Sequence, residues 1–227
     1  MKKTSKKRKL TQEEKDHRFY RRAWRLLAGF FRFILSLRPR GQENVPSEGG
    51  AILCINHIAA VDAISVAACC PRQLRYLAKK ELFGVPVLGW LIRRLGATPL
   101  DRGGSDVAAL KKTVALAANG ELTAVFPQGH RQPGKNPADT PIRNGAGMIA
   151  FRAKTSVVPV CLKMKKQRYA LFRRVEVIFG KPISYEELFP NGEGGTDAYA
   201  AASRRIFDEI CKLGGFLPST EGERECP

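Results

Sequence analysis

The chain has 227 residues, the length of one ordinary domain with at most a short appendage. Hydrophobic residues make up 44% and charged residues 26%, which supplies enough apolar side chain for a full core and excludes general disorder. Its 39 lysines and arginines outnumber 21 acidic residues, giving a formal net charge of +18. Such an excess favours a polyanionic partner, and composition leaves open nucleic acid, anionic lipid, a phosphorylated substrate or an acidic carrier protein.

The six cysteines contain no pair at the two-residue separation of a zinc knuckle or a redox motif. Most lie in apolar runs, so we expect reduced, buried thiols and a cytosolic compartment. The basic N-terminus is not followed by a short apolar run with a small-residue cleavage site, which argues against a secretory signal. With three histidines in the chain, a metal cluster is not expected.

The N-terminal part predicts two segments that suit an anionic membrane. Residues 1–16 are polar and lysine-rich, and indicate a disordered basic arm. Residues 17–39 predict an amphipathic helix, because Arg21, Arg25 and Arg32 share a narrow edge of the helical wheel. We expect this helix to lie in the membrane interface, contacting lipid through Trp24, Leu27, Phe30, Phe31 and Ile34. Packing against the protein's own core, or a true span, are the alternatives, although arginines interrupt the roughly 20 apolar residues that a span needs.

The remaining elements are predicted from apolar periodicity and turn residues. Strands are expected at 51–56, 122–127, 157–164 and 174–184, and 73–83 reads as a strand leading into a helix. Helices are expected at 60–70, 85–96, 105–120, 145–154 and 196–215. Because strands and helices alternate, we predict a single α/β domain over 40–215, with a mostly parallel or mixed sheet flanked by helices. Residues 216–227 indicate a tail.

One stretch carries the clearest chemistry. His57 directly follows the predicted strand 51–56, and Asp62 comes five residues later, where a strand-to-helix turn is expected. A carboxylate that reaches back to an imidazole fixes its tautomer and makes it a general base. No nucleophile of the Gly-x-Ser-x-Gly type accompanies the pair, so the histidine would act directly on a substrate hydroxyl without a covalent intermediate. Taken alone, an H-x₄-D spacing is a weak signal of catalysis, because a structural hydrogen bond between the two residues is the more common explanation.

One short motif precedes the H-x₄-D pair and several others follow it along the chain. With it, the chain from about residue 40 to 181 resembles the glycerolipid acyltransferase family, whose bacterial members include 1-acylglycerol-3-phosphate acyltransferases. The matching stretches are 41–46 (GQENVP), 56–62 (NHIAAVD), 79–82 (KKEL), 89–90 (GW), 96–102 (GATPLDR), 126–131 (FPQGHR) and 158–160 (VPV).

The resemblance implies a role for each matching position. His57 would take the proton from the acceptor hydroxyl, and Asp62 would orient it. Lys79, Arg102 and Arg131 would hold the phosphate of the acceptor, for which guanidinium groups are well suited.

The third and fourth motifs supply the other expected substrate-binding residues. Gly129 would allow close approach of the backbone to the substrate, while Val158 and Pro159 would line the side of the acyl donor. The third motif departs from the usual F-P-E-G-T-R, because Gln128 replaces glutamate and His130 replaces threonine. Gln128 keeps an acceptor oxygen and loses the negative charge, which puts the identity of the acceptor in question more than the reaction.

The resemblance therefore implies transfer of an acyl group from a thioester to 1-acyl-sn-glycerol-3-phosphate, giving phosphatidic acid. The expected partners are an anionic membrane, the lysophospholipid, and acyl-CoA or acyl carrier protein as co-substrate, with no other cofactor and no nucleic acid. We expect a peripheral or monotopic protein of the cytoplasmic membrane, with its active site facing the cytosol. The alternatives are another acceptor (glycerol-3-phosphate, another lysophospholipid or a lyso-aminolipid), a family member without catalysis, and a basic nucleic-acid-binding protein.

Overall fold

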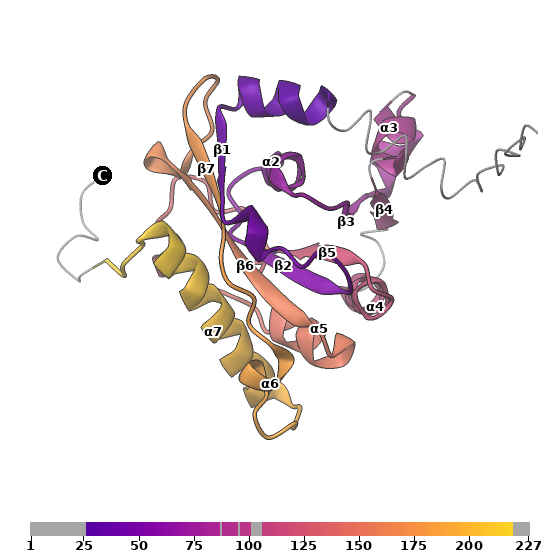
Figure 1. Cartoon of the computed structure of the whole chain (residues 1–227), viewed down its shortest axis with the longest axis vertical. Coiled ribbons are helices and arrows are strands. Elements are labelled where there is room, and N and C mark those ends of the chain that lie inside the picture. Colours follow the sequence, from indigo (N-terminus) through magenta and orange to yellow (C-terminus); the bar gives the residue numbers. More distant parts are fainter. Residues whose placement is uncertain (1–25, 87, 95, 101–105, 220–227) are drawn as a thin grey trace, which may run out of the picture.

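A seven-stranded sheet runs through the centre of the computed structural model, which describes residues 26–86, 88–94, 96–100 and 106–219 (Figure 1). Its strand order is β1-β7-β6-β2-β5-β3-β4. The strands are β1 Leu37–Arg40, β2 Ala51–Ile55, β3 Leu74–Lys79, β4 Ala97–Leu100, β5 Leu122–Val125, β6 Ser156–Met164 and β7 Val175–Phe179. Strand β6 pairs antiparallel with β7, and the other pairings are parallel. The expected mixed sheet is thereby confirmed.

Helices cover both faces of this sheet, as Figure 1 shows. The α-helices are α2 Asp62–Cys69, α3 Leu88–Arg94, α4 Asp106–Ala118, α5 Gly145–Ala153, α6 Tyr185–Leu188 and α7 Thr196–Gly214, and residues 26–34 are also helical. Short 3₁₀ helices occupy η1 Gln42–Asn44, η2 Lys80–Gly84, η3 Pro137–Asp139 and η4 Lys165–Gln167. One buried cluster joins the sheet to α2 and the 26–34 helix, and a second joins it to α4, α5 and α7. This two-faced core is the reason that β2 and most of β6 are apolar without alternation.

The sequence-based boundary of the N-terminal helix was wrong at its C-terminal end. The described helix covers 26–34, and Leu37–Arg40 is strand β1 instead of its last turn. Leu37 is buried while Arg38 and Arg40 are exposed, the period-two pattern of a strand. Pro39 is tolerated because β1 lies at the edge of the sheet, where its missing N–H breaks no ladder hydrogen bond.

Strand β4 was also missed, for a related reason. It is four residues long, lies at the opposite edge of the sheet and contains Pro99. Such short edge strands carry little periodicity. Among the residues that the structure describes, no helix combines the length and apolar character needed to cross a bilayer.

Candidate active site

The candidate site begins where the central strand β2 ends. Asn56, the next residue, is fully buried, and its side chain continues the ladder with β6. Its Nδ2 donates to the carbonyl oxygen of Leu162 at 2.9 Å, and its Oδ1 accepts from the Leu162 N–H at 2.7 Å. The side chain therefore satisfies β6 while the backbone turns away from the sheet. This places His57 above the carboxyl ends of parallel strands, where open α/β sheets bind ligands.

His57 and Asp62 form the predicted pair. The imidazole Nδ1 lies 2.7 Å from Asp62 Oδ2, and the same oxygen accepts from the backbone N–H groups of Ile58 at 2.6 Å and Ala59 at 2.9 Å. Asp62 is fully buried at the first turn of α2, while the His57 side chain is 17% exposed. Because Nδ1 donates to the carboxylate, Nε2 is left as the basic nitrogen. The Phe126 ring stacks on the imidazole, with centroids 4.1 Å apart, and fixes its plane.

Gln128 braces the backbone of this pair. Its Oε1 accepts from the His57 N–H at 2.5 Å, and its Nε2 donates to Thr140 Oγ1 at 2.7 Å. The Thr140 hydroxyl in turn donates to the carbonyl oxygen of Pro137 at 2.7 Å. Gln128 is only 3% exposed, and both ends of its amide are used within the protein. Both polar ends of the Gln128 amide therefore have hydrogen-bond partners within the protein, and contact of Gln128 with substrate stays a prediction.

The loop that follows Gln128 contains exposed basic residues and is hydrogen-bonded to His57. The Gln132 N–H donates to the His57 carbonyl oxygen at 2.8 Å, which ties the loop to the residue just after β2. Gly129 has φ +72°, a left-handed conformation that favours glycine, and a Cβ there would also displace the Arg143 side chain, whose Cδ would lie 2.8 Å away. Arg143 Nη2 is 2.8 Å from His130 Nε2, and His130 must accept because a guanidinium only donates. Arg131 is exposed on the same loop.

Four other substrate-binding predictions have different outcomes. Lys79 is the last residue of β3, but its side chain is not among those described, and Arg102 lies outside the described residues. Val158 and Pro159 lie buried in β6, in register with Leu53 and Cys54 of β2. Their contact with an acyl donor stays a prediction.

The predicted membrane residues divide between two faces of the 26–34 helix. Phe30 is 57% exposed, whereas Leu27 and Phe31 pack against the core cluster and Ile34 is partly buried. Trp24 lies outside the described residues. The helix therefore packs one apolar face on the protein's own core and leaves another exposed, and its contact with a membrane stays a prediction.

Several residues near the pair were missed from the sequence. Besides Phe126, Thr140 and Arg143, the Tyr169 hydroxyl donates to Ser65 Oγ of α2 at 3.1 Å. Burial, and then the negative charge of nearby Asp62, raise the pKa of Tyr169, so it stays a neutral donor. Tyr169 is 104 residues from Ser65 in sequence, and no local pattern indicates such a contact.

Comparisons with known proteins agree with this geometry. The family model described as Acyltransferase matches residues 36–163, which include the pair and the third motif. The chain is 30% identical over 199 residues to 1-acyl-sn-glycerol-3-phosphate acyltransferase of Bacillus subtilis, covering 84% of this chain and 98% of that protein. It is also 30% identical over 176 residues to the enzyme of that name from Streptococcus pneumoniae, covering 75% of this chain and 63% of that protein.

A solved structure shows the same fold. The crystal structure of the 1-acyl-sn-glycerophosphate (LPA) acyltransferase PlsC from Thermotoga maritima superposes with a TM-score of 0.68 at 21% identity. The match covers 92% of this chain and 86% of that one. The chain belongs to the acyltransferase family. It is an enzyme that transfers an acyl group.

Proposed function

We propose that the chain acylates 1-acyl-sn-glycerol-3-phosphate to give phosphatidic acid. The observation that carries this proposal is the His57–Asp62 pair, whose 2.7 Å contact leaves Nε2 as the base at the carboxyl end of β2. The names of the Bacillus and Streptococcus relatives support the choice of acceptor.

The proposed reaction needs no covalent enzyme intermediate. Nε2 of His57 removes the proton from the free hydroxyl of the acceptor, whose oxygen attacks the carbonyl carbon of the acyl thioester. Asp62 stabilises the imidazolium that forms, and its oxygen is itself fixed by two backbone N–H groups. The tetrahedral intermediate collapses with cleavage of the C–S bond, and the leaving thiolate takes the proton from Nε2. The products are phosphatidic acid and the free thiol of coenzyme A or of acyl carrier protein.

The basic residues of the motifs would hold the phosphate of the acceptor. Arg131 is exposed and directly precedes Gln132, whose N–H donates to the His57 carbonyl oxygen, and this position supports the role. Lys79 ends β3, next in the sheet to the β5 strand that leads into that loop. Together with Arg102, these two residues would place their cationic side chains around the doubly charged phosphate of the acceptor.

We further propose that the enzyme works as a peripheral or monotopic protein at the cytoplasmic membrane, with its site on the cytosolic side. Both its acyl acceptor and its product are membrane lipids. The exposed face of the 26–34 helix, with Leu26 80% and Phe30 57% exposed, supports contact with the interface.

The test is acyl transfer from a long-chain acyl-CoA and from acyl carrier protein to 1-acyl-sn-glycerol-3-phosphate in mixed micelles. We expect phosphatidic acid from the parent and a loss of at least about 10³-fold in kcat for His57→Ala, because the base is removed. Product formation by His57→Ala at the parental rate would refute the mechanism. A parent that acylates glycerol-3-phosphate or another lysophospholipid better would refute the proposed acceptor.

A further inference from the structure

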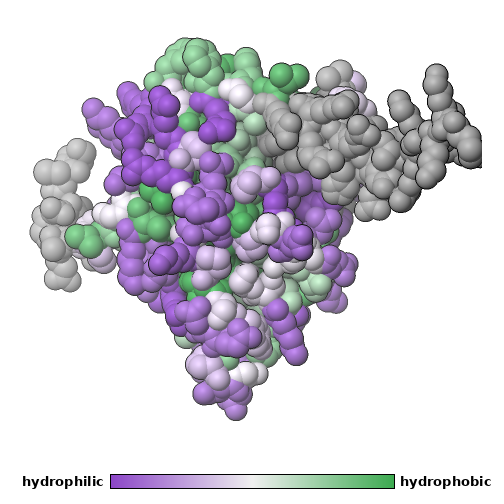
Figure 2. Space-filling view, viewed as in Figure 1, coloured by the Kyte–Doolittle hydropathy of each residue, from purple (hydrophilic) through white to green (hydrophobic). Residues whose placement is uncertain are grey.

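Large apolar side chains gather on the surface where the 26–34 helix meets the turn between β6 and β7. We call this surface the apolar platform; it consists of Leu26, Phe30, Phe33, Leu171 and Phe172, which are 80, 57, 72, 70 and 64% exposed. Figure 2 shows hydrophobic residues gathered at this end of the molecule, with hydrophilic residues directly beneath. Exposed apolar side chains grouped in this way mark an interaction site, unlike isolated ones.

The two parts of the platform are joined by direct contacts. The Phe172 N–H donates to the Ile34 carbonyl oxygen at 3.0 Å, and the Val175 N–H donates to the Ser36 carbonyl oxygen at 3.2 Å. The rings of Phe33 and Phe172 meet edge to face, with centroids 5.9 Å apart. The turn and the helix therefore present one continuous surface.

Phe172, at this surface, has an unfavourable backbone conformation. Its φ is +58°, in the left-handed region that bulky residues avoid. Its side chain stays 64% exposed, so burial in the core does not compensate for the strain. The contacts with Ile34 and Phe33 hold this conformation in place, and backbone strain held in this way clusters at functional sites.

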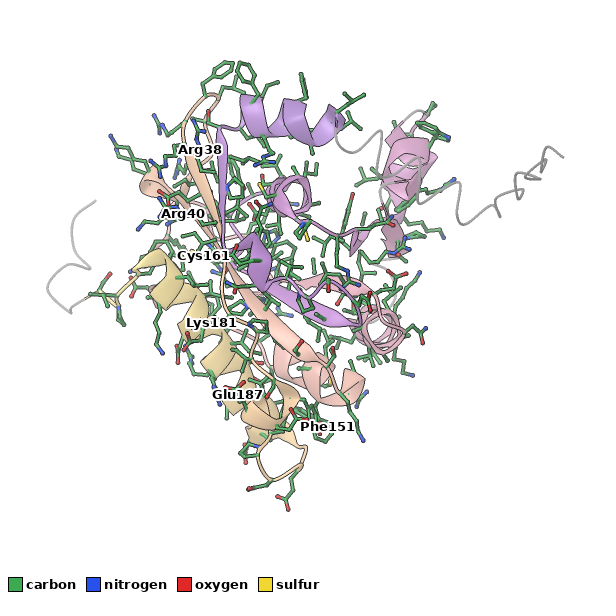
Figure 3. The ribbon with its side chains drawn as sticks, in the orientation of Figure 1. Arg38, Arg40, Phe151, Cys161, Lys181 and Glu187 are labelled. Atoms are coloured by element: carbon green, nitrogen blue, oxygen red, sulfur yellow. The ribbon has the colours of Figure 1, made fainter. Side chains whose placement is uncertain are left out.

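The turn that carries Leu171 and Phe172 is strongly basic. Residues 165–174 contain no acidic residue, and the exposed cations there are Lys165, Lys166, Arg168, Arg173 and Arg174. Arg38 and Arg40 lie just below on β1 (Figure 3). Glu176 pairs with Arg174 at 3.0 Å and with Arg40 at 3.6 Å, so it neutralises only part of this charge.

We propose that the β6–β7 turn is a second membrane-contacting element, in which Leu171 and Phe172 enter the acyl boundary of an anionic bilayer. The cations of the turn then lie at the level of the phosphate headgroups. A second copy of this chain fits the surface poorly, because a symmetric contact would bring the two basic turns together. The inference rests on the proposed function, which puts the lipid substrates in a membrane, and it extends membrane contact beyond the N-terminal helix.

Fluorescence tests the insertion directly. In the full chain with Trp24→Phe and Trp90→Phe, we compare Phe172→Trp with Leu217→Trp on vesicles of phosphatidylcholine and phosphatidylglycerol carrying brominated acyl chains. Leu217 is a matched control because it is 79% exposed and lies in the segment after α7, which Figure 1 shows apart from the 26–34 helix. We expect a blue shift and strong quenching at position 172 and neither at 217. Equal quenching at the two positions, or none at 172, would overturn the proposal.

Vesicle affinity provides the second measurement. Replacing Leu171 and Phe172 together by serine should raise the vesicle dissociation constant at least about tenfold, while Leu217→Ser changes it less than about twofold, since only the former removes apolar area from the bilayer. The thermal midpoints of both variants are compared with that of the parent to confirm folding. A folded double variant that binds vesicles like the parent, or a parent dimer that this variant dissociates, contradicts the inference. Binding is measured without substrate, so an inactive parent that still inserts the turn would refute the proposed function alone.

Discussion

The side-chain amide of Asn56 hydrogen-bonds both the N–H and the C=O of Leu162, a role that the backbone of a neighbouring strand plays elsewhere in the sheet. Asn56→Ala would leave the N–H and C=O of Leu162 without partners inside the sheet. We expect the free energy of unfolding to fall by about 2–4 kcal/mol, since each buried group left unsatisfied costs about 1–3 kcal/mol. Urea denaturation measures this loss. Asn56→Asp turns a carboxylate oxygen towards the Leu162 carbonyl oxygen in a fully buried site, so it should destabilise the fold at least as much as alanine. An Ala variant as stable as the parent would contradict this role.

Gln128 raises the question whether the altered third motif changes the acceptor. Its amide is bonded to His57 and Thr140 and is almost fully buried. Gln128→Glu keeps the acceptor for the His57 N–H, but Thr140 must then turn its hydroxyl from Pro137 to the carboxylate. We expect the order of preference among lysophospholipid acceptors to stay the same, with a loss of stability of about 1 kcal/mol from the lost hydrogen bond.

Relative kcat/KM values over a panel of acceptors measure that preference. Gln128→Met is the shape-matched control, because it removes both hydrogen bonds and should lower kcat for every acceptor alike, by at least about tenfold. A change of preferred acceptor in Gln128→Glu would mean that residue 128 contacts substrate.

At the scale of elements, helices α5 and α7 owe their close packing to one glycine. A Cβ on Gly147 would lie 2.3 Å from the Tyr199 carbonyl oxygen, and the Gly147 N–H donates to the buried Ser203 Oγ at 2.9 Å. Gly147→Ala should therefore destabilise the fold by about 2–4 kcal/mol through forced separation of the helices.

Gly145→Ala is the control in the same helix. There the nearest atom to a new Cβ is Leu110 Cδ2 at 3.6 Å, an ordinary contact, so alanine should be neutral or stabilise by up to about 1 kcal/mol. Thermal unfolding of both variants decides, and equal midpoints would show that α5 and α7 are free to move apart.

The elements also show how far the sequence could predict the structure. Helix α7 and strand β2 were predicted because their apolar patterns are long or continuous, and the His57–Asp62 pair because both partners follow one strand within six residues. The edge strands β1 and β4 were missed because each has four residues and a proline. The contact of Tyr169 with Ser65 was missed because it depends on the register of distant strands, which a single sequence does not encode locally.

At the scale of the whole molecule, the cysteine thiols of the described residues are shielded from solvent. Cys54, Cys69, Cys161 and Cys211 are buried free cysteines, and Cys70 is partly buried. Burial raises the pKa of Cys69 and Cys161 to about 12 and that of Cys70 and Cys211 to about 11. Because a raised pKa keeps a thiol neutral below that pH, these groups are poor nucleophiles at pH 8.

We expect the Cys226→Ser variant, which removes the cysteine outside the described residues, to react with Ellman's reagent at least about 100-fold more slowly when native than in guanidinium chloride. In the denatured control, all five remaining thiols should react quickly with the reagent. A fast native phase at pH 8 would show that one of these cysteines is accessible.

The pairing of β1 with β7 has a consequence for the order of assembly. Leu37 lies in register with Val175, so strand β1 cannot pair with β7 until residue 175 and the rest of β7 have been synthesised. The parallel core of β2, β5 and β6 is complete earlier in translation than this edge. Residues 26–34 and the β6–β7 turn therefore come together only after β7 has been synthesised, and a chain that terminates before β7 would carry the exposed helix without this partner. If both elements contact the membrane as proposed, a chain that ends before β7 would lack the joined surface.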